Sequence, residues 1–278
     1  VCKAESAQLF KPLFIEAMED ETDSVRLSAA EGLIYIDPAQ GLGILRNYTG
    51  DKSLAVQKKI ITLAGKVGGV EDLNWLVEKT RQTNGSRTAW DSMLRIFTDA
   101  ETSVLKNWMD RLSEPETIGN LSDEQIISFY EIADRKAEAA KQLEIQKVSK
   151  SNLAKLYQKT GSFEQAAKQL GWLWENAETL PERQDLFARQ LEVYWSWANL
   201  EGVKGLISNS LAKGDLDPNG VVAGSIEKNL SEPLGGLDAG AILKILETIQ
   251  TSDLIRPNWK KKLDGWKQRF SDSDKAGS

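Results

Sequence analysis

Residues 23–38, which read DSVRLSAAEGLIYIDP, contain the pattern that decides the fold. Their apolar side chains recur at the spacing i, i+4, i+8 and i+11, which places them on one face of an α-helix: Val25, Ala29, Leu33 and Ile36. Asp23 or Ser24 can cap the start of this helix. Pro38 then opens a second helix, where its missing N–H costs nothing. The stretch therefore predicts a helical hairpin.

The same pattern returns further along the chain. Thirty-one residues later the equivalent positions hold Val56, Ile60, Ala64 and Val67, and a weaker third copy contains Ala89, Met93 and Phe97. Partner helices are expected between the copies, at residues 38–47 and 70–79. The Val-Arg start of the first copy and the Leu-Ala-Gly end of the second resemble HEAT-type repeats, over about residues 4–112. This resemblance implies a stack of antiparallel helix pairs.

A different repeat begins with residues 152–167, which read NLAKLYQKTGSFEQAA. Ala154 and Ala166 leave room for two antiparallel helices to approach, and Tyr157 fills the space between them. Gly161 suits a turn that other residues resist.

With Phe163 and the later Pro181, these residues resemble a tetratricopeptide repeat, and the resemblance covers about residues 150–213. A degenerate copy follows 37 residues later, in which Ala198 replaces the turn glycine and Leu191 replaces the small residue. The geometry of this second turn is an open question at the level of sequence.

The expected helix at residues 182–199 is apolar on two opposite sides, as in an interior member of a stacked array. We therefore predict an all-α fold, a right-handed α-α superhelix (solenoid) of antiparallel helical hairpins. The predicted domains are HEAT-like repeats at 1–118 and tetratricopeptide-like repeats with C-terminal capping helices at 119–270. A disordered tail is predicted at 271–278.

Composition excludes several classes of function. The 278 residues contain no histidine, a single cysteine (Cys2) and a net charge of −6. Ser-His and Cys-His catalysis and the usual zinc and haem ligands are therefore absent, and no phosphate-binding glycine loop is recognisable. We expect no cofactor and no metal. The acidic balance gives little support to nucleic-acid binding, and no apolar run is long enough for membrane insertion.

One loop resembles half of a calcium site. Residues 215–220 offer oxygen ligands at alternate positions followed by Gly220. The twelfth position, which should supply a carboxylate, is Ile226. The alternative is a turn in which Asp217 or Asn219 caps the next helix.

Candidate partner-binding residues follow from the tetratricopeptide resemblance, because that family lines its groove with the first helix of each hairpin. The resemblance places Asn152, Lys155 and Lys159 in the groove, with Arg189 one repeat later, a strip suited to an acidic peptide or a terminal carboxylate. A solvated lysine face is the alternative interpretation. Trp172 either anchors a partner or packs against the next hairpin.

We predict a non-catalytic helical-repeat scaffold that mediates protein–protein or protein–peptide interaction, as a region of a larger protein. The alternative is an all-α carbohydrate-active enzyme or sugar-binding domain that uses Trp and Glu or Asp in a groove. A deep cleft that combines Trp with a desolvated acid would favour this alternative. A third possibility is a structural spacer.

Overall fold

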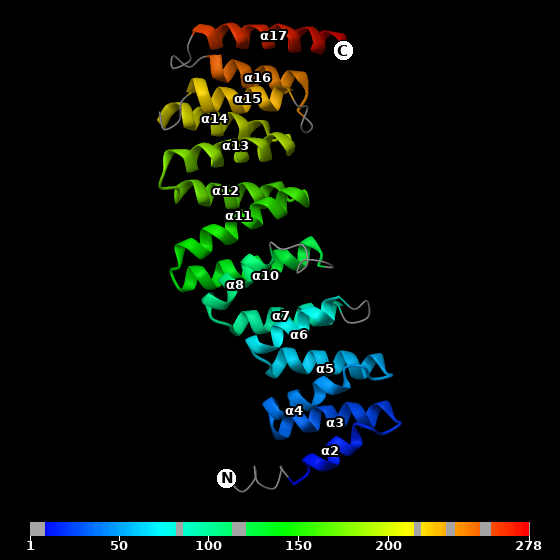
Figure 1. The fold of residues 1–278 in the computed structure, drawn as a ribbon. Coiled ribbons are helices and arrows are strands. Elements are labelled where there is room, and N and C mark those ends of the chain that lie inside the picture. The colour runs from blue at the N-terminus through cyan, green and yellow to red at the C-terminus, as the bar shows by residue number, and fades with distance from the viewer. Residues whose placement is uncertain are drawn as a thin grey trace. The chain divides into compact units, whose positions relative to one another are not determined.

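The computed structural model describes residues 9–81, 86–112, 121–213, 218–231, 237–250 and 257–277. Within these ranges the chain forms α-, 3₁₀- and π-helical segments, and there is no strand. Figure 1 shows the helices following one another in chain order. The predicted all-α helical-repeat solenoid is confirmed.

The chain divides into two compact units, residues 1–149 (unit 1) and 150–278 (unit 2). The division falls inside helix α11 (Leu143–Lys159). The predicted boundary at residues 118 and 119 falls instead within a segment outside the described residues.

Unit 1 consists of short helices that pack against their neighbours in sequence. They are α2 (Lys11–Ala17), α3 (Asp23–Ile36), α4 (Pro38–Leu45), α5 (Leu54–Val67), α6 (Leu73–Thr80), α7 (Ser86–Asp99), α8 (Thr102–Arg111) and α10 (Asp123–Ala139), with 3₁₀ turns at Arg46–Tyr48 and Val70–Asp72. Helices α3, α5, α7 and α10 contact one another in that order, so they form one row. Helices α4, α6 and α8 pack beside this row.

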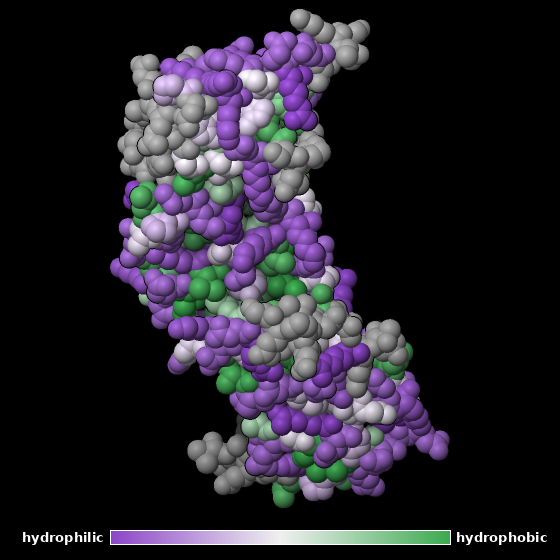
Figure 2. Space-filling model, turned by 45° about the horizontal axis from the view of Figure 1, so that its top comes forward, coloured by the Kyte–Doolittle hydropathy of each residue, from purple (hydrophilic) through white to green (hydrophobic). Residues whose placement is uncertain are grey.

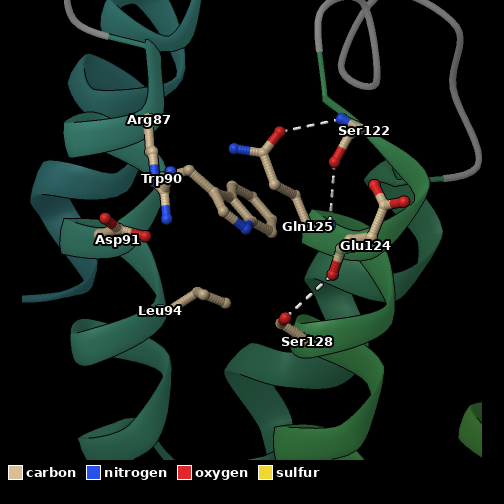
Figure 3. Close-up of a pocket in the computed structure, with 8 residues that line it drawn as sticks. All are labelled: Arg87, Trp90, Asp91, Leu94, Ser122, Glu124, Gln125 and Ser128. Carbon is tan, nitrogen blue, oxygen red and sulfur yellow. Dashed lines mark hydrogen bonds between the residues drawn. The ribbon is translucent and has the colours of Figure 1, made fainter.

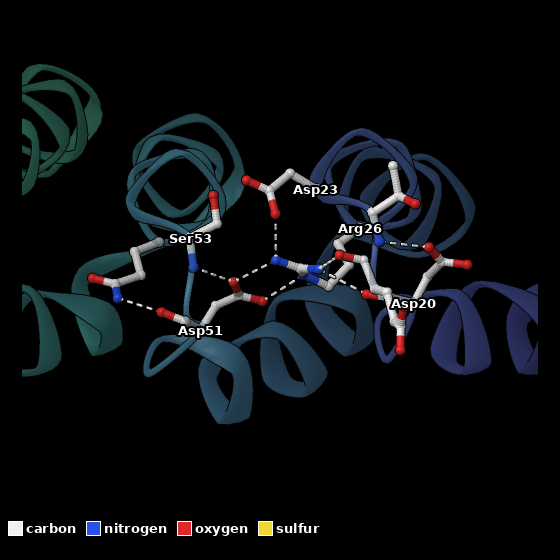
Figure 4. A network of polar contacts seen from close by, with 8 residues as sticks. Asp20, Asp23, Arg26, Asp51 and Ser53 are labelled. Atoms are coloured by element: carbon white, nitrogen blue, oxygen red, sulfur yellow. Dashed lines mark hydrogen bonds and ion pairs between the residues drawn. The ribbon is translucent and has the colours of Figure 1, made fainter.

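Helix α3 differs from the predicted register. Ala29 and Leu33 are buried as predicted, but Val25 is 38% exposed whereas Arg26 is only 2% exposed. The guanidinium of Arg26 donates five hydrogen bonds, two of them to the carboxylate of Asp51 at 2.8 and 2.9 Å (Figure 4). The others go to Asp23 and to main-chain carbonyls. Because every N–H donor of the guanidinium is used, the charge can be buried.

Helices α5 and α7 approach closely because Gly65 has no side chain. A Cβ atom at this position would lie 2.6 Å from the Cα atom of Ser92. The Ser92 hydroxyl donates a 2.9 Å hydrogen bond across the contact to the carbonyl of Ile61. The glycine in the Leu-Ala-Gly element thus sets the spacing between two repeats.

Unit 2 is helical as well. They are the C-terminal part of α11, then α12 (Phe163–Glu175), α13 (Leu180–Ser196), α14 (Leu200–Lys213), α15 (Ala223–Ser231), α16 (Ala239–Gln250) and α17 (Pro257–Gly277), with a π-helical turn at Pro218–Val222. Contacts link α12 to α13, α13 to both α14 and α15, α14 to α16, and α16 to α17. Ala154 and Ala166 are buried in the hairpin of α11 and α12, as the sequence predicts.

The α11–α12 and α13–α14 turns of unit 2 have the same backbone geometry. Gly161 has φ +77° and Ala198 has φ +54°, both left-handed. The next residue in each turn donates its N–H to the carbonyl of the equivalent tyrosine, Tyr157 at 2.7 Å and Tyr194 at 2.9 Å. This pattern is a Schellman helix end. The alanine therefore adopts the turn that glycine takes in the first hairpin.

The last helix packs its apolar stripe against the rest of unit 2. Trp259 and Leu263 are buried, and Trp266 and Phe270 are partly buried in the same cluster. Helix α17 runs on to Gly277, whereas the sequence analysis predicts disorder from residue 271. The side chain of Gln268 donates to the carboxylate of Asp272 at 3.0 Å, and no proline or glycine interrupts residues 271–276, so a helix can continue. No described helix is both long enough and apolar enough to span a membrane.

Candidate partner-binding surface

Helices α11, α13 and α15 of unit 2 are joined side by side through polar side chains. Arg189 on α13 donates to the hydroxyl and carbonyl oxygens of Ser151 on α11 at 3.3 and 3.4 Å. The side-chain amide of Gln158 on α11 donates to the carboxylate of Glu192 on α13 at 3.2 Å. The same carboxylate lies 3.9 Å from the ammonium group of Lys228 on α15. We call this set of helices the α11–α13–α15 row.

Lys155 and Lys159 lie on α11 in this row, and both are exposed. Lys155 makes no ion pair with another described residue. Asn152, one turn earlier, is half-buried. Of the five predicted site residues, these two lysines are the ones that present an exposed side chain.

Arg189 has a different position from the one expected for a partner contact. Its side chain is half-buried and donates a hydrogen bond to Ser151. The guanidinium also lies 3.8 Å from the carboxylate of Asp185, one turn earlier on the same helix. Arg189 therefore links α13 to α11 within the row. The sequence could not show that its hydrogen bonds are formed within the row.

Trp172 lies on α12, outside the row, and is half-buried against the apolar cluster around Ala154 and Leu170. The ammonium group of Lys150 lies 4.9 Å from the centroid of its ring. Lys150 is itself buried and donates to Gln169 at 3.4 Å. A cation over the ring makes Trp172 part of the hairpin packing.

The visible surface also bears on the kind of contact that a partner can make. On the face drawn in Figure 2, hydrophilic residues predominate and hydrophobic residues lie in separate groups among them. A partner of this face would therefore be recognised largely through polar groups.

A cavity of about 210 Å³ lies among α12, α13 and α14. It is lined by Gly171, Trp174, Glu175, Gln190, Leu206, Asn209 and Ser210. Gln190 is buried there, and its amide nitrogen lies 3.8 Å from where a Cβ on Gly171 would be. Glu175, the acid beside Trp174, is exposed. Sequence patterns did not single out Gln190, because a glutamine in a helix usually points to solvent.

A larger cavity, of about 400 Å³, lies between α7 and α10 of unit 1 (Figure 3). It is lined by Arg87, Trp90, Asp91, Leu94, Ser122, Glu124, Gln125 and Ser128. The pKa of Glu124 is lowered, chiefly by a hydrogen bond from the Ser122 side chain and next by its own main-chain N–H. The two acids in this cavity, Asp91 and Glu124, are exposed. The sequence analysis missed this cavity because its walls come from helices on either side of a long connection.

Metal binding has no structural support in the part of the chain described. Nowhere in that part do three His, Cys, Asp or Glu side chains gather in a way that could hold an ion. The first residues of the loop that resembles half of a calcium site, from Asp215, lie outside the described residues.

Comparison with known proteins identifies one family. A family model of HEAT repeats matches residues 11–93, which form α2 to α7 of unit 1. No curated protein matches the chain. The chain is thus similar to HEAT repeats over α2 to α7, as the sequence resemblance predicted for this region.

Proposed function

We propose that this chain is a non-catalytic helical-repeat scaffold that binds a protein or peptide partner on the α11–α13–α15 row. The observation that carries the proposal is the position of Lys155. It is exposed on a row whose neighbouring polar groups already bind one another, and it has no ion pair with a described residue. A cation presented in this way on linked helices can bind an acidic group without a prior rearrangement.

The charges of the row favour an acidic segment as the partner. Glu192 is an acid of the row, and its carboxylate is engaged by Gln158 and Lys228. Lys155 and Lys159 project from the same helix one turn apart. Their combined field would attract carboxylates, for example an acidic peptide or a C-terminus.

The tetratricopeptide-like arrangement of unit 2 belongs to this proposal. Its support is the repeated left-handed turn at Gly161 and Ala198, 37 residues apart, after equivalent tyrosines. In such an arrangement Asn152 and Arg189 would border the acidic segment. Trp172 would support the hairpin.

The alternative, a carbohydrate-active enzyme, requires an acid with a raised pKa beside an aromatic ring. In the two cavities described above, each lined by a tryptophan, the neighbouring acids are exposed, and the pKa of Glu124 moves down rather than up. These features favour a scaffold.

The proposal is tested by affinity capture with the full chain from a lysate of the organism that makes it. The double variant K155E/K159E should lose the captured partner, because its two changes replace attraction with repulsion. The control is K244E, which makes the same charge change at an exposed position on α16, outside the row. Melting temperatures of all variants should stay within about 2 °C, as expected for surface changes. Equal capture by K155E/K159E and the parent chain would contradict the proposal.

A further inference from the structure

Gln190 on α13 carries a buried side-chain amide that the described chain does not use. The residue is 8% exposed, and its amide makes no hydrogen bond with a described residue. The amide borders the cavity of about 210 Å³ among α12, α13 and α14, and neither of its polar atoms is sealed from solvent. Buried amides are nearly always paired, because an unpaired one loses hydration without compensation. A group that enters the cavity from outside is therefore the expected partner.

The walls of this cavity leave room for such a group. Helix α13 lies between α12 and α14 and contacts both (Figure 1). On α12 the wall is formed by Gly171, where a Cβ atom would meet nothing closer than the Gln190 amide nitrogen at 3.8 Å. Packing does not require a glycine there, and a glycine inside a helix costs stability. A glycine in such a place suits the close approach of a ligand.

Two further polar side chains line the cavity with their hydrogen-bonding groups unused. Glu175 on α12 and Asn209 on α14 are exposed, and neither makes a hydrogen bond or an ion pair with a described residue. The hydroxyl of Ser210 is engaged, because it donates to the carbonyl of Leu206 at 2.8 Å. Trp174 and Leu206, both half-buried, supply apolar surface. The cavity thus combines a buried amide, an exposed amide and carboxylate, and an apolar wall.

These groups together favour a ligand that carries one amide and several hydroxyls. The direct complement of the Gln190 carboxamide is a second amide, because each offers one donor beside one acceptor and two hydrogen bonds form at once. Hydroxyls suit Glu175 and Asn209, because a hydroxyl can donate to a carboxylate and can both donate to and accept from an amide. A methyl group or a C–H face suits the indole of Trp174.

We infer that this cavity binds the acetamido group of an N-acetylated amino sugar. The Gln190 amide donates to the acetamido carbonyl and accepts from the acetamido N–H, while the methyl group lies against Trp174 and Leu206. Hydroxyls of the sugar ring bind Asn209 and Glu175. An acetamido group enters a small cavity end-on because it terminates in a methyl group. A peptide group inside a chain fits less well, because the chain continues on both sides of it.

This inference is independent of the proposed function. The cavity lies among α12, α13 and α14, and neither Lys155 nor Lys159 lines it. Binding a sugar without cleaving it is compatible with a scaffold, since no acid catalysis is required. The double variant K155E/K159E should bind the sugar as the parent chain does, so failure of either proposal is recognised separately.

The test is a titration of the full chain, labelled with ¹⁵N in its glutamine side chains, with methyl N-acetyl-β-glucosaminide. The amide signals of Gln190 are identified by their absence in the variant Q190M. We expect these signals to move, with a Kd in the millimolar range, about 1–10 mM.

Two further probes separate the contributions. Methyl β-glucoside keeps the ring and lacks the acetamido group, so it should bind at least about fivefold more weakly without the two hydrogen bonds to Gln190. N-acetyl-glycine N′-methylamide keeps the amide and lacks the hydroxyls, and it should also bind at least about fivefold more weakly.

The variant Q190M keeps a side chain of similar length and removes both polar atoms. It should weaken the amino sugar at least about tenfold without lowering the melting temperature, because no hydrogen bond within the described chain is lost. Binding to the variants is followed by saturation transfer to the acetyl methyl signal of the probe. The control Q165M makes the same change at an exposed position on α12 that does not line the cavity, and it should bind as the parent does. A second variant, G171L, fills the cavity with a side chain and should abolish binding while the chain stays folded.

Gln190 signals that stay in place up to about 50 mM amino sugar would overturn the inference and leave the cavity to water. Unchanged binding to Q190M would overturn it as well. A peptide probe that binds as tightly as the amino sugar would also contradict it and would assign the cavity to a peptide.

Discussion

In unit 1 successive hairpins are joined by buried charged side chains, whereas in unit 2 the ion pairs lie at the surface. Arg26 and Asp51 are both buried, and so is Asp72, the partner of Arg46. Each ion pair among the described residues of unit 2 contains at least one exposed side chain. Unit 2 instead packs small residues against aromatic ones, with Ala154 and Ala166 beside Tyr157. The same stacking of helices can thus be stabilised by buried ion pairs in one unit and, in the other, by the packing of small against aromatic side chains together with polar contacts nearer the surface.

The largest loss of stability is expected from the variant D51A. This change leaves the guanidinium of Arg26 buried without its main partner and should lower the stability of unit 1 by about 3 kcal/mol. Hydrogen exchange with mass spectrometry on the full chain should show lost protection in α3 to α5 and unchanged protection in α12 to α14. The control E78A breaks the exposed pair of Glu78 and Arg81 and should have almost no effect. Equal losses in both units would refute the contrast between them.

A second test concerns the close approach of α5 and α7. In G65A the new methyl group meets the backbone of Ser92, so the helices must separate, at a cost of about 2 kcal/mol. Gly43 on α4 has open space around it, and G43A should instead stabilise by up to about 1 kcal/mol through helix propensity. Urea unfolding gives both values. Changes of the same sign would show that Gly65 does not set the helix spacing.

The two turns of unit 2 should respond in opposite directions. A198G removes the strain of a left-handed alanine and should stabilise unit 2 by about 0.5–1 kcal/mol, whereas G161A should destabilise it by about 1 kcal/mol. Both changes are measured by thermal unfolding. A loss of stability in A198G would mean that the two turns are not equivalent.

The smallest expected effect is a loss of stability of unit 1 at low pH. The pKa values of three carboxyl groups in unit 1 are lowered: Asp23 mainly by a hydrogen bond from the Ser53 side chain, Glu31 by Lys59 and Glu124 by Ser122. A lowered folded-state pKa gives stability that is present above the unfolded-state value and is lost as the pH falls through the folded-state value. Exchange protection of unit 1 should therefore decline below about pH 4. High salt should weaken the part of this decline that comes from the charge of Lys59 beside the exposed Glu31, because salt screens charges but not hydrogen bonds. A decline that begins above about pH 5 would contradict the assignment to these three carboxyl groups.

The sequence predicted what depends on local periodicity. The hairpins, the small residues Ala154 and Ala166 and the turn at Gly161 were all visible, because helix period and turn chemistry are short-range properties. The burial of Arg26 was not, since a pattern that counts apolar residues assigns arginine to solvent. Its partner Asp51 is 25 residues away.

The candidate site was only partly predictable for the same reason. The tetratricopeptide resemblance selected Lys155 and Lys159, and both side chains are exposed. The internal hydrogen bonds of Arg189 depend on where α11 lies beside α13. The cavity that Trp90 lines depends on α10, which begins more than thirty residues later. Contacts between distant segments decide both, and a single sequence does not contain them.

The most direct test of the scaffold function places a photoreactive amino acid at position 155 of the full chain, and in a separate chain at position 244. We predict that the chain modified at position 155 forms a covalent adduct with its partner upon irradiation, and that an acidic competitor peptide suppresses it. The chain modified at position 244 should form none. An adduct that forms equally well from both positions, or only from position 244, would contradict a partner-binding role for the α11–α13–α15 row.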